Sequence, residues 1–155
     1  MNLSSFELRI PPPIIFTLCA LLALFLSWLT PVHFPLATVA WFLCALCFAA
    51  SGVIGIASLF SFWRAKTTAN PVRVNEATSL VESGLYAFSR NPMYLALALL
   101  LLSLCFYLAN PFAFIAVALF VAYITRFQIV PEERALEARF GERYRRYRQR
   151  VRRWI

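Results

Sequence analysis

Charged residues are scarce in this chain: they make up 14% of its 155 residues, while 61% are hydrophobic. A soluble domain of this size has too little interior to hide so much apolar surface. Residues 14–29, 36–63 and 93–109 contain no charged residue, and residues 112–130 contain only Arg126. Each stretch is about as long as the ~20 residues that a helix needs to cross a bilayer, or longer. The sequence therefore predicts an all-α integral membrane protein with about four transmembrane helices, at 14–29, 36–62, 92–109 and 111–130.

Histidine and acidic residues are also few, and their positions exclude several classes of site. His33, the only histidine, lies in the short connection after the first predicted span, so it cannot serve as a ligand or base at the opposite end. All seven acidic residues lie outside the predicted spans, which argues against a proton-coupled transporter. The four cysteines lie inside apolar spans and are interpreted as small buried hydrophobes, so no metal site is expected: Cys19, Cys44, Cys47 and Cys105.

The basic residues have a strongly one-sided distribution. Of the 15 Lys and Arg residues, 14 lie before the first span, between the second and third, or after the fourth. The connections 30–35 and 110–111 contain none. Because cytoplasmic segments of membrane proteins are enriched in Lys and Arg, we expect a multi-pass topology with both termini cytoplasmic and a cytoplasmic loop at 64–91. Anionic lipid headgroups, rather than nucleic acid, are the expected partners of the arginine-rich tail.

The second predicted span is longer than a bilayer requires and contains two glycines three residues apart. Gly52 and Gly55 allow either a break in the helix or close packing against a neighbouring helix. A tilt of the whole helix would also accommodate the extra length.

The last polar segment, residues 132–153, has apolar residues at helical spacing. They step by four, four, three and four positions and so share one face: Leu136, Phe140, Tyr144, Tyr147 and Val151. The opposite face is rich in arginine, which is typical of a helix that lies on a membrane surface. We therefore expect a C-terminal amphipathic cytoplasmic helix over 132–153, in which Gly141 marks a bend.

Asn91 and Pro92 predict the start of the third helix, since Asn is a good N-cap and Pro a good first helical residue. The free amide groups and the positive end of the helix dipole would then lie beside Arg90. Such a helix start suits a carboxylate or a phosphate. An ordinary capped helix next to a surface arginine is the alternative.

Two further polar groups flank the end of the fourth predicted span. Glu132 and Glu133 follow it directly, where they either complement a helix dipole or face a cationic or hydroxyl-bearing ligand. Arg126 and Gln128 lie about one turn inside the span. An arginine at this depth either extends to the interface or marks a functional site.

Four short patterns occur together in a fixed order: TTANP at 67–71, LVESGLY at 80–86, SRNPMYL at 89–95 and EExxLxxxFGxxYxxY at 132–147. This set resembles the isoprenylcysteine carboxyl methyltransferase and phospholipid methyltransferase superfamily, over roughly residues 60–153. The resemblance implies a helical membrane enzyme that uses S-adenosylmethionine and releases S-adenosylhomocysteine. It also implies that the cofactor binds near the third and fourth helices on the cytoplasmic side.

The resemblance assigns roles to particular residues. Those that fall on the cofactor-binding segment and the paired-glutamate motif are Gly84, Tyr86, Arg90, Asn91, Pro92, Tyr94, Glu132 and Glu133. Glu132 and Glu133 are also the acids available for catalysis, and Arg126 is expected to pair with an acceptor carboxylate or headgroup. The family usually has Arg-His-Pro where this chain has Arg90-Asn91-Pro92. Asparagine does not titrate near neutral pH, so it cannot take an acid–base role.

The methyl acceptor is expected to be lipophilic or membrane-embedded, with a carboxylate, amine or thiol as the reacting group. A second possibility is a non-catalytic membrane protein of the same fold that binds a lipid or scaffolds a complex. A reductase that uses a nicotinamide cofactor is a third, on analogy of fold alone.

Overall fold

The computed structural model describes residues 8, 10–33, 37–64 and 80–155, and its regular elements are helices. The long ones are α1 (Pro12–Leu29), α2 (Ala37–Arg64), α3 (Pro92–Leu108), α4 (Phe114–Ile124), α5 (Val130–Phe140) and α6 (Glu142–Arg150). Three short helical turns are η3 (Gly84–Ala87), η4 (Pro111–Ala113) and η5 (Thr125–Ile129). The all-α prediction is confirmed. Most of the loop predicted at 64–91, namely 65–79 with the TTANP pattern, lies outside the described residues.

Three helical stretches are long and apolar enough to cross a membrane by length and composition: Pro12–Leu29, Thr38–Ser61 and Pro111–Phe140. Helix α3 is also apolar but shorter, with 17 residues, or about 25 Å at ~1.5 Å per residue. Many large apolar side chains face outward; Ile56 is 72% exposed and Trp28 78%. An apolar surface of this extent belongs in lipid, as expected for an integral membrane protein.

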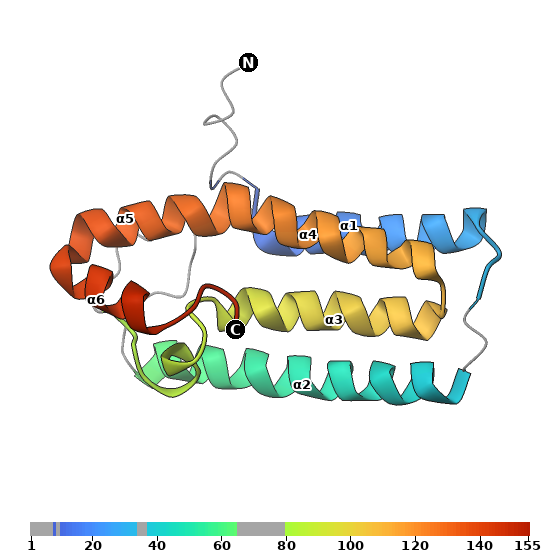
Figure 1. The fold of residues 1–155 in the computed structure, drawn as a ribbon, viewed down its shortest axis with the longest axis horizontal. Coiled ribbons are helices and arrows are strands. Elements are labelled where there is room, and N and C mark those ends of the chain that lie inside the picture. Colours follow the sequence, from blue (N-terminus) through green and yellow to red (C-terminus); the bar gives the residue numbers. More distant parts are fainter. Residues whose placement is uncertain (1–7, 9, 34–36, 65–79) are drawn as a thin grey trace, which may run out of the picture.

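The four apolar helices run lengthwise beside one another, with α3 between α2 and the α1–α4 pair (Figure 1). The core lies where α1, α3 and α4 meet and is closed by fully buried Ala23, Leu101, Cys105 and Phe120. Ala23 and Cys105 are small and let the helices approach closely, while Leu101 and Phe120 fill the space between them.

Helix α2 packs along α3 and is continuous through both of its glycines. A Cβ added at Gly55 would lie 3.6 Å from the Cβ of Ala96, whereas nothing lies within 4 Å of the corresponding position at Gly52. One turn away, the Ser51 hydroxyl donates to the Ala96 carbonyl at 2.8 Å. Of the alternatives left open by the sequence, close packing at Gly55 is observed and a break is not.

At the end of the bundle that lacks charge, a buried asparagine ties two connections together. The Asn110 Nδ2 donates to the carbonyl oxygen of Thr30 at 2.5 Å, and its Oδ1 accepts from the Phe112 amide at 2.8 Å. Asn110 is fully buried. It therefore fixes the turn that leads into α4 against the end of α1.

Helices α4 and α5 form one rod joined by the π-helical turn η5. Proline at 131 has no N–H, so the carbonyl of Phe127 loses its helical donor. That carbonyl accepts instead from the Leu8 amide at 3.1 Å, and the Val130 amide bonds to Thr125, five residues back. The fourth helical stretch therefore does not end at 130, as the sequence suggested, but continues to Phe140.

The single helix predicted over 132–153 is instead two helices. Helix α5 continues the rod, and Gly141 adopts a positive φ of 51°. Helix α6 then runs back toward the bundle, and the segment that follows it lies beside the start of α3 (Figure 1). Glycine adopts such a φ without steric cost, which explains the reversal at this point. The bend at Gly141 was expected, but the change of direction was not.

The predicted apolar stripe of the tail does form one buried face. Tyr144 and Tyr147 are 1% and 3% exposed and cluster with Leu80 and Val151, while Leu136 and Phe140 pack partly against them. This face packs on the protein itself.

Candidate active site at the charged end of the bundle

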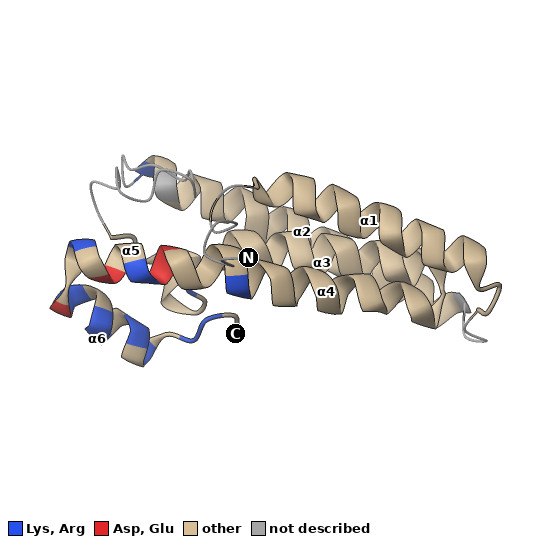
Figure 2. Cartoon of the chain, turned by 90° about the horizontal axis from the view of Figure 1, so that it is seen from above, with Lys and Arg blue, Asp and Glu red and all other residues tan. Residues whose placement is uncertain are grey.

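Charged residues are concentrated at one end of the helices, on α5, α6 and the chain that follows α6 (Figure 2). In Figure 1 the same end holds η3 and the start of α3. Four side chains from three segments form what we call the glutamate–arginine cluster: Arg90, Glu132, Glu133 and Arg153.

Glu133 is the centre of this cluster and is only 7% exposed. Its Oε1 lies 3.0 Å from Nη2 of Arg90 and accepts from Nε of Arg153 at 3.0 Å. Its Oε2 accepts from Nη2 of Arg153 at 2.8 Å. Arg153 therefore makes a two-pronged contact, the strong and directional form of an arginine–carboxylate pair.

Arg90 is the least satisfied member of the cluster. Its side chain is 8% exposed, and its Nη2 is used by Glu133. Among the described residues, its Nε and Nη1 are buried without a hydrogen-bond partner. Buried donors of a charged group are costly when left unpaired, so this position fits a further anionic group.

Glu132 points to α3 and is held by a tyrosine. The hydroxyl of Tyr94, a side chain that is 7% exposed, donates to Oε1 of Glu132. The two glutamates thus have different partners, Glu132 a neutral phenol and Glu133 two guanidinium groups. The structure brings Tyr94, Arg90 and both predicted glutamates to one place.

Asn91 does not act as the predicted side-chain cap, although α3 does begin at Pro92. Its Nδ2 instead donates to the carbonyl oxygen of Arg153 at 2.9 Å. Its own amide bonds to the Ser89 hydroxyl at 3.2 Å. The side chain is diverted because the segment after α6 passes beside it. The asparagine that replaces the usual family histidine is thus engaged with the backbone, and it leaves the first amides of α3 uncapped by its side chain.

Gly84 and Tyr86 lie in η3, just before the cluster. Gly84 has a positive φ of 64°, which favours glycine. Tyr86 is 7% exposed, and its carbonyl oxygen accepts from the Tyr147 hydroxyl at 2.7 Å. Burial raises the pKa of Tyr144 to about 12 and also raises the pKa of Tyr147. Both phenols are therefore neutral near pH 7. These tyrosines hold η3 against α6.

Arg126 lies in η5, the π-helical turn that precedes α5. Its side chain is exposed, with the guanidinium carbon 5.4 Å from the centre of the Phe127 ring. Gln128, two residues on, is fully buried and its Nε2 donates to the carbonyl of Ile10 at 2.7 Å. Residues two apart on a helix point in roughly opposite directions. The two side chains therefore face opposite ways, with Gln128 directed into the protein and Arg126 outward.

The sequence did not reveal the role of the segment after α6. Arg153 and Trp154 contact the cluster and η5, where the Trp154 Nε1 donates to the Thr125 hydroxyl at 3.3 Å. Arg153 is one of nine arginines between 134 and 153, and nothing in its local sequence distinguishes it from the others. A return of the chain onto α3 depends on the turn at Gly141 and cannot be inferred from the periodicity.

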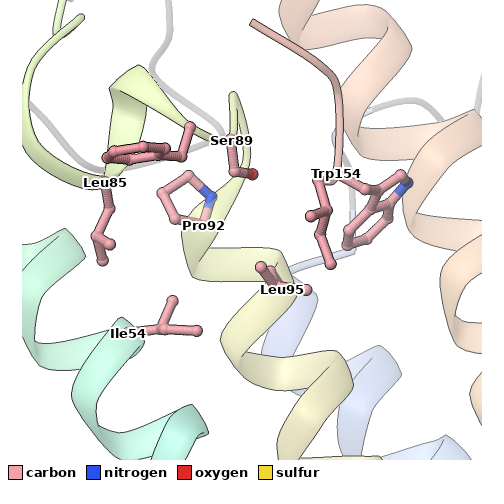
Figure 3. Close-up of a pocket in the computed structure, with 8 residues that line it drawn as sticks. Ile54, Leu85, Ser89, Pro92, Leu95 and Trp154 are labelled. Carbon is pink, nitrogen blue, oxygen red and sulfur yellow. The ribbon is translucent and has the colours of Figure 1, made fainter.

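An apolar pocket of about 210 Å³ lies beside the start of α3. Figure 3 shows that α2, η3, α3 and the segment after α6 all contribute to it. The labelled residues that line it are Ile54, Leu85, Ser89, Pro92, Leu95 and Trp154. Pro92 thus lines this pocket, while Tyr94, on the other side of the same helical turn, contacts Glu132.

Comparison with known proteins identifies a family for this chain. The family model described as phospholipid methyltransferase matches residues 39–143, which is more than half of the chain. An uncharacterized protein of Haemophilus influenzae is 49% identical over 63 residues, which are 41% of this chain and the whole of that protein. No solved structure matches the chain. The chain therefore belongs to the phospholipid methyltransferase family, within the integral membrane methyltransferases, as the sequence patterns indicated.

Proposed function

We propose that this protein transfers a methyl group from S-adenosylmethionine to a lipophilic or membrane-embedded acceptor. The observation that carries the proposal is Arg90, a buried guanidinium in which two nitrogens, Nε and Nη1, lack hydrogen-bond partners among the described residues. It lies beside Glu133, and α3 begins two residues after it, at Pro92. A buried cation next to uncapped amides suits the carboxylate of an amino-acid moiety. Membership of a methyltransferase family supports this cofactor.

The residues divide by charge between the two ends of the cofactor. Arg90 and the first amides of α3 would hold its carboxylate, and Glu132 its amine or ribose hydroxyls. Gly84, Tyr86 and Pro92 would shape the wall around it. When bound, the cofactor supplies an electrophilic methyl group on a sulfonium, and the protein's task is to orient the acceptor and exclude water.

The pocket next to Pro92 suits the hydrocarbon part of the acceptor, because it is lined almost entirely by apolar side chains. An acceptor carboxylate would need no general base. An amine or thiol would need one, and Glu132 is our candidate, with Tyr94 orienting it. Asn91 takes no part in proton transfer. Arg126, on the outer face, would contact a headgroup rather than the reacting atoms.

We further propose that the charged end faces the cytoplasm, with a multi-pass topology and both termini on that side. The support is the clustering of charged residues at one end of the helices (Figure 2). Anionic headgroups would contact the arginines of α6. Several of these arginines already pair with acids, Arg143 and Arg150 with Glu82 and Arg148 with Glu137, so this contact is expected to be weak.

A methyl-transfer assay tests the proposal. Detergent-purified protein is incubated with S-adenosylmethionine labelled on the methyl group and with lipid extracts, and label is measured in lipids separated by headgroup. We expect label in a lipophilic product, reduced about ten- to hundredfold by Arg90→Ala, the loss expected for a charge-assisted contact. Arg146→Ala is the control, because this arginine is 74% exposed and pairs with exposed Glu142 on its own helix. If folded protein labels no extract, the non-catalytic lipid-binding or scaffold role takes its place.

A further inference from the structure

The chain after α6 is bound to the start of α3 by several independent contacts. Residues Ser89 and Arg152 form a parallel bridge, and the Arg90 amide donates to the carbonyl of Arg152 at 3.0 Å. The Asn91 side chain donates to the next carbonyl, that of Arg153. Backbone and side-chain bonds thus join two segments about 60 residues apart in sequence.

The same short segment also contacts the α4–α5 rod. The Arg153 guanidinium bonds both oxygens of Glu133, and the Trp154 indole donates to Thr125 in the π-helical turn. Residues 151–154 therefore connect α3 to α5 across the charged end of the bundle.

We propose that residues 151–154 are a latch that positions the cofactor site, with Asn91 and Arg153 as its positioning residues. This inference rests on the proposed function, since it concerns how that site is kept in order. Neither residue is catalytic: each acts through another group, Asn91 through the backbone of the latch and Arg153 through Glu133.

The latch acts on Arg90 through Glu133. Arg153 occupies Oε2 of Glu133 and shares Oε1, which leaves a single contact for Arg90, through its Nη2. Nε and Nη1 of Arg90 thereby remain open to a ligand. Without Arg153, Glu133 is free to turn both oxygens toward Arg90 and to compete with the ligand for its donors. Asn91 keeps Arg153 at the right distance by holding its backbone.

Hydrogen exchange and calorimetry test the latch on the full-length protein in detergent. We expect Arg153→Ala to speed exchange of the Arg90 amide, which bonds to the latch, and to weaken binding of S-adenosylhomocysteine, each about tenfold. Arg152→Ala is the matched control, because it removes the same charge from an exposed side chain and keeps the backbone bonds. Arg153→Lys keeps the charge without the two-pronged geometry and should give an intermediate result.

Variants at position 91 test whether the specific bond from the Asn91 side chain to the Arg153 carbonyl, rather than general loosening of the segment, protects the Arg90 amide. Asn91→Ala should speed exchange in the same way, and Asn91→His should restore protection, because imidazole can donate to the Arg153 carbonyl. The latch is overturned if the Arg90 amide exchanges equally fast in Arg153→Ala and Arg152→Ala. It is also overturned if this amide exchanges as fast in Asn91→His as in Asn91→Ala. Failure of the wild-type protein to bind S-adenosylhomocysteine would instead count against the proposed function.

Discussion

Replacing Glu133 by glutamine should destabilise the protein strongly, because this carboxylate neutralises two guanidinium groups. Glu133 is 7% exposed and the side chain of Arg90 8%, whereas that of Arg153 is 38% exposed. Removing one partner of a buried ion pair costs about 3–5 kcal/mol. Glutamine keeps one acceptor and Arg153 is partly solvated, so we expect the lower end, about 3 kcal/mol. For a chain of this length that corresponds to a fall of about 6–12 °C in melting temperature.

The assay is thermal unfolding of the purified protein in detergent, followed by circular dichroism. Glu137→Gln is the control, since Glu137 also pairs with two arginines, Arg145 and Arg148, but all three side chains are solvent-accessible, at 34%, 57% and 52% exposed. Such surface pairs contribute about 0–1 kcal/mol. Equal melting temperatures for the two variants would refute the claim that burial makes the Glu133 cluster different.

Further predictions concern other parts of the molecule. Tyr94→Phe removes the donor to Glu132 and should weaken binding of S-adenosylhomocysteine about tenfold in calorimetry, with an unchanged helical circular dichroism spectrum as the check on folding. Gly55→Ala should be tolerated, because the added Cβ meets Ala96 at 3.6 Å, while Gly55→Leu should lower the melting temperature by separating α2 from α3. Because burial raises the pKa of Tyr144 to about 12 from an ordinary value of 10.0, its neutral form stabilises the fold below pH 10. That contribution should be lost between pH 10 and 12, and Tyr144→Phe should reduce the loss in unfolding experiments. A cysteine at position 33 should react with an impermeant reagent only from outside the cell; labelling only from the cytoplasm would contradict the proposed orientation.

The helices of the bundle were predictable because lipid imposes a simple rule on them. A spanning helix must be about 20 residues long and nearly free of charge, so the uncharged runs predicted α1 to α3 to within a few residues. The buried stripe of the tail was predictable because apolar residues at helical spacing lie on one face of a helix. The end of the fourth helix was not predictable, because the helix continues past Pro131. A π-helical turn and the Leu8 amide compensate for the hydrogen-bond donor that proline lacks.

The sequence predicted which residues form the candidate site better than it predicted the contacts between them. Short patterns near Arg90 and Glu132 marked both segments, and the structure brings them together. The sequence suggested an anionic ligand group near Arg90 and a cationic one near Glu132 or Glu133, yet in the structure Arg90 and Glu133 bind each other. The part of Arg153 was not foreseeable, because it depends on the chain reversal at Gly141 and on a backbone pairing that leaves no pattern in the sequence.

Titration calorimetry with S-adenosylmethionine and S-adenosylhomocysteine tests the central claim most directly, because it needs no knowledge of the acceptor. The experiment uses folded protein in detergent, with Arg90→Ala as the site variant and Arg146→Ala as the surface control. We predict saturable binding of both compounds at one site per chain, weakened ten- to hundredfold by Arg90→Ala and unchanged by Arg146→Ala. Absence of binding at millimolar concentration, or binding that is insensitive to Arg90→Ala, would contradict the account.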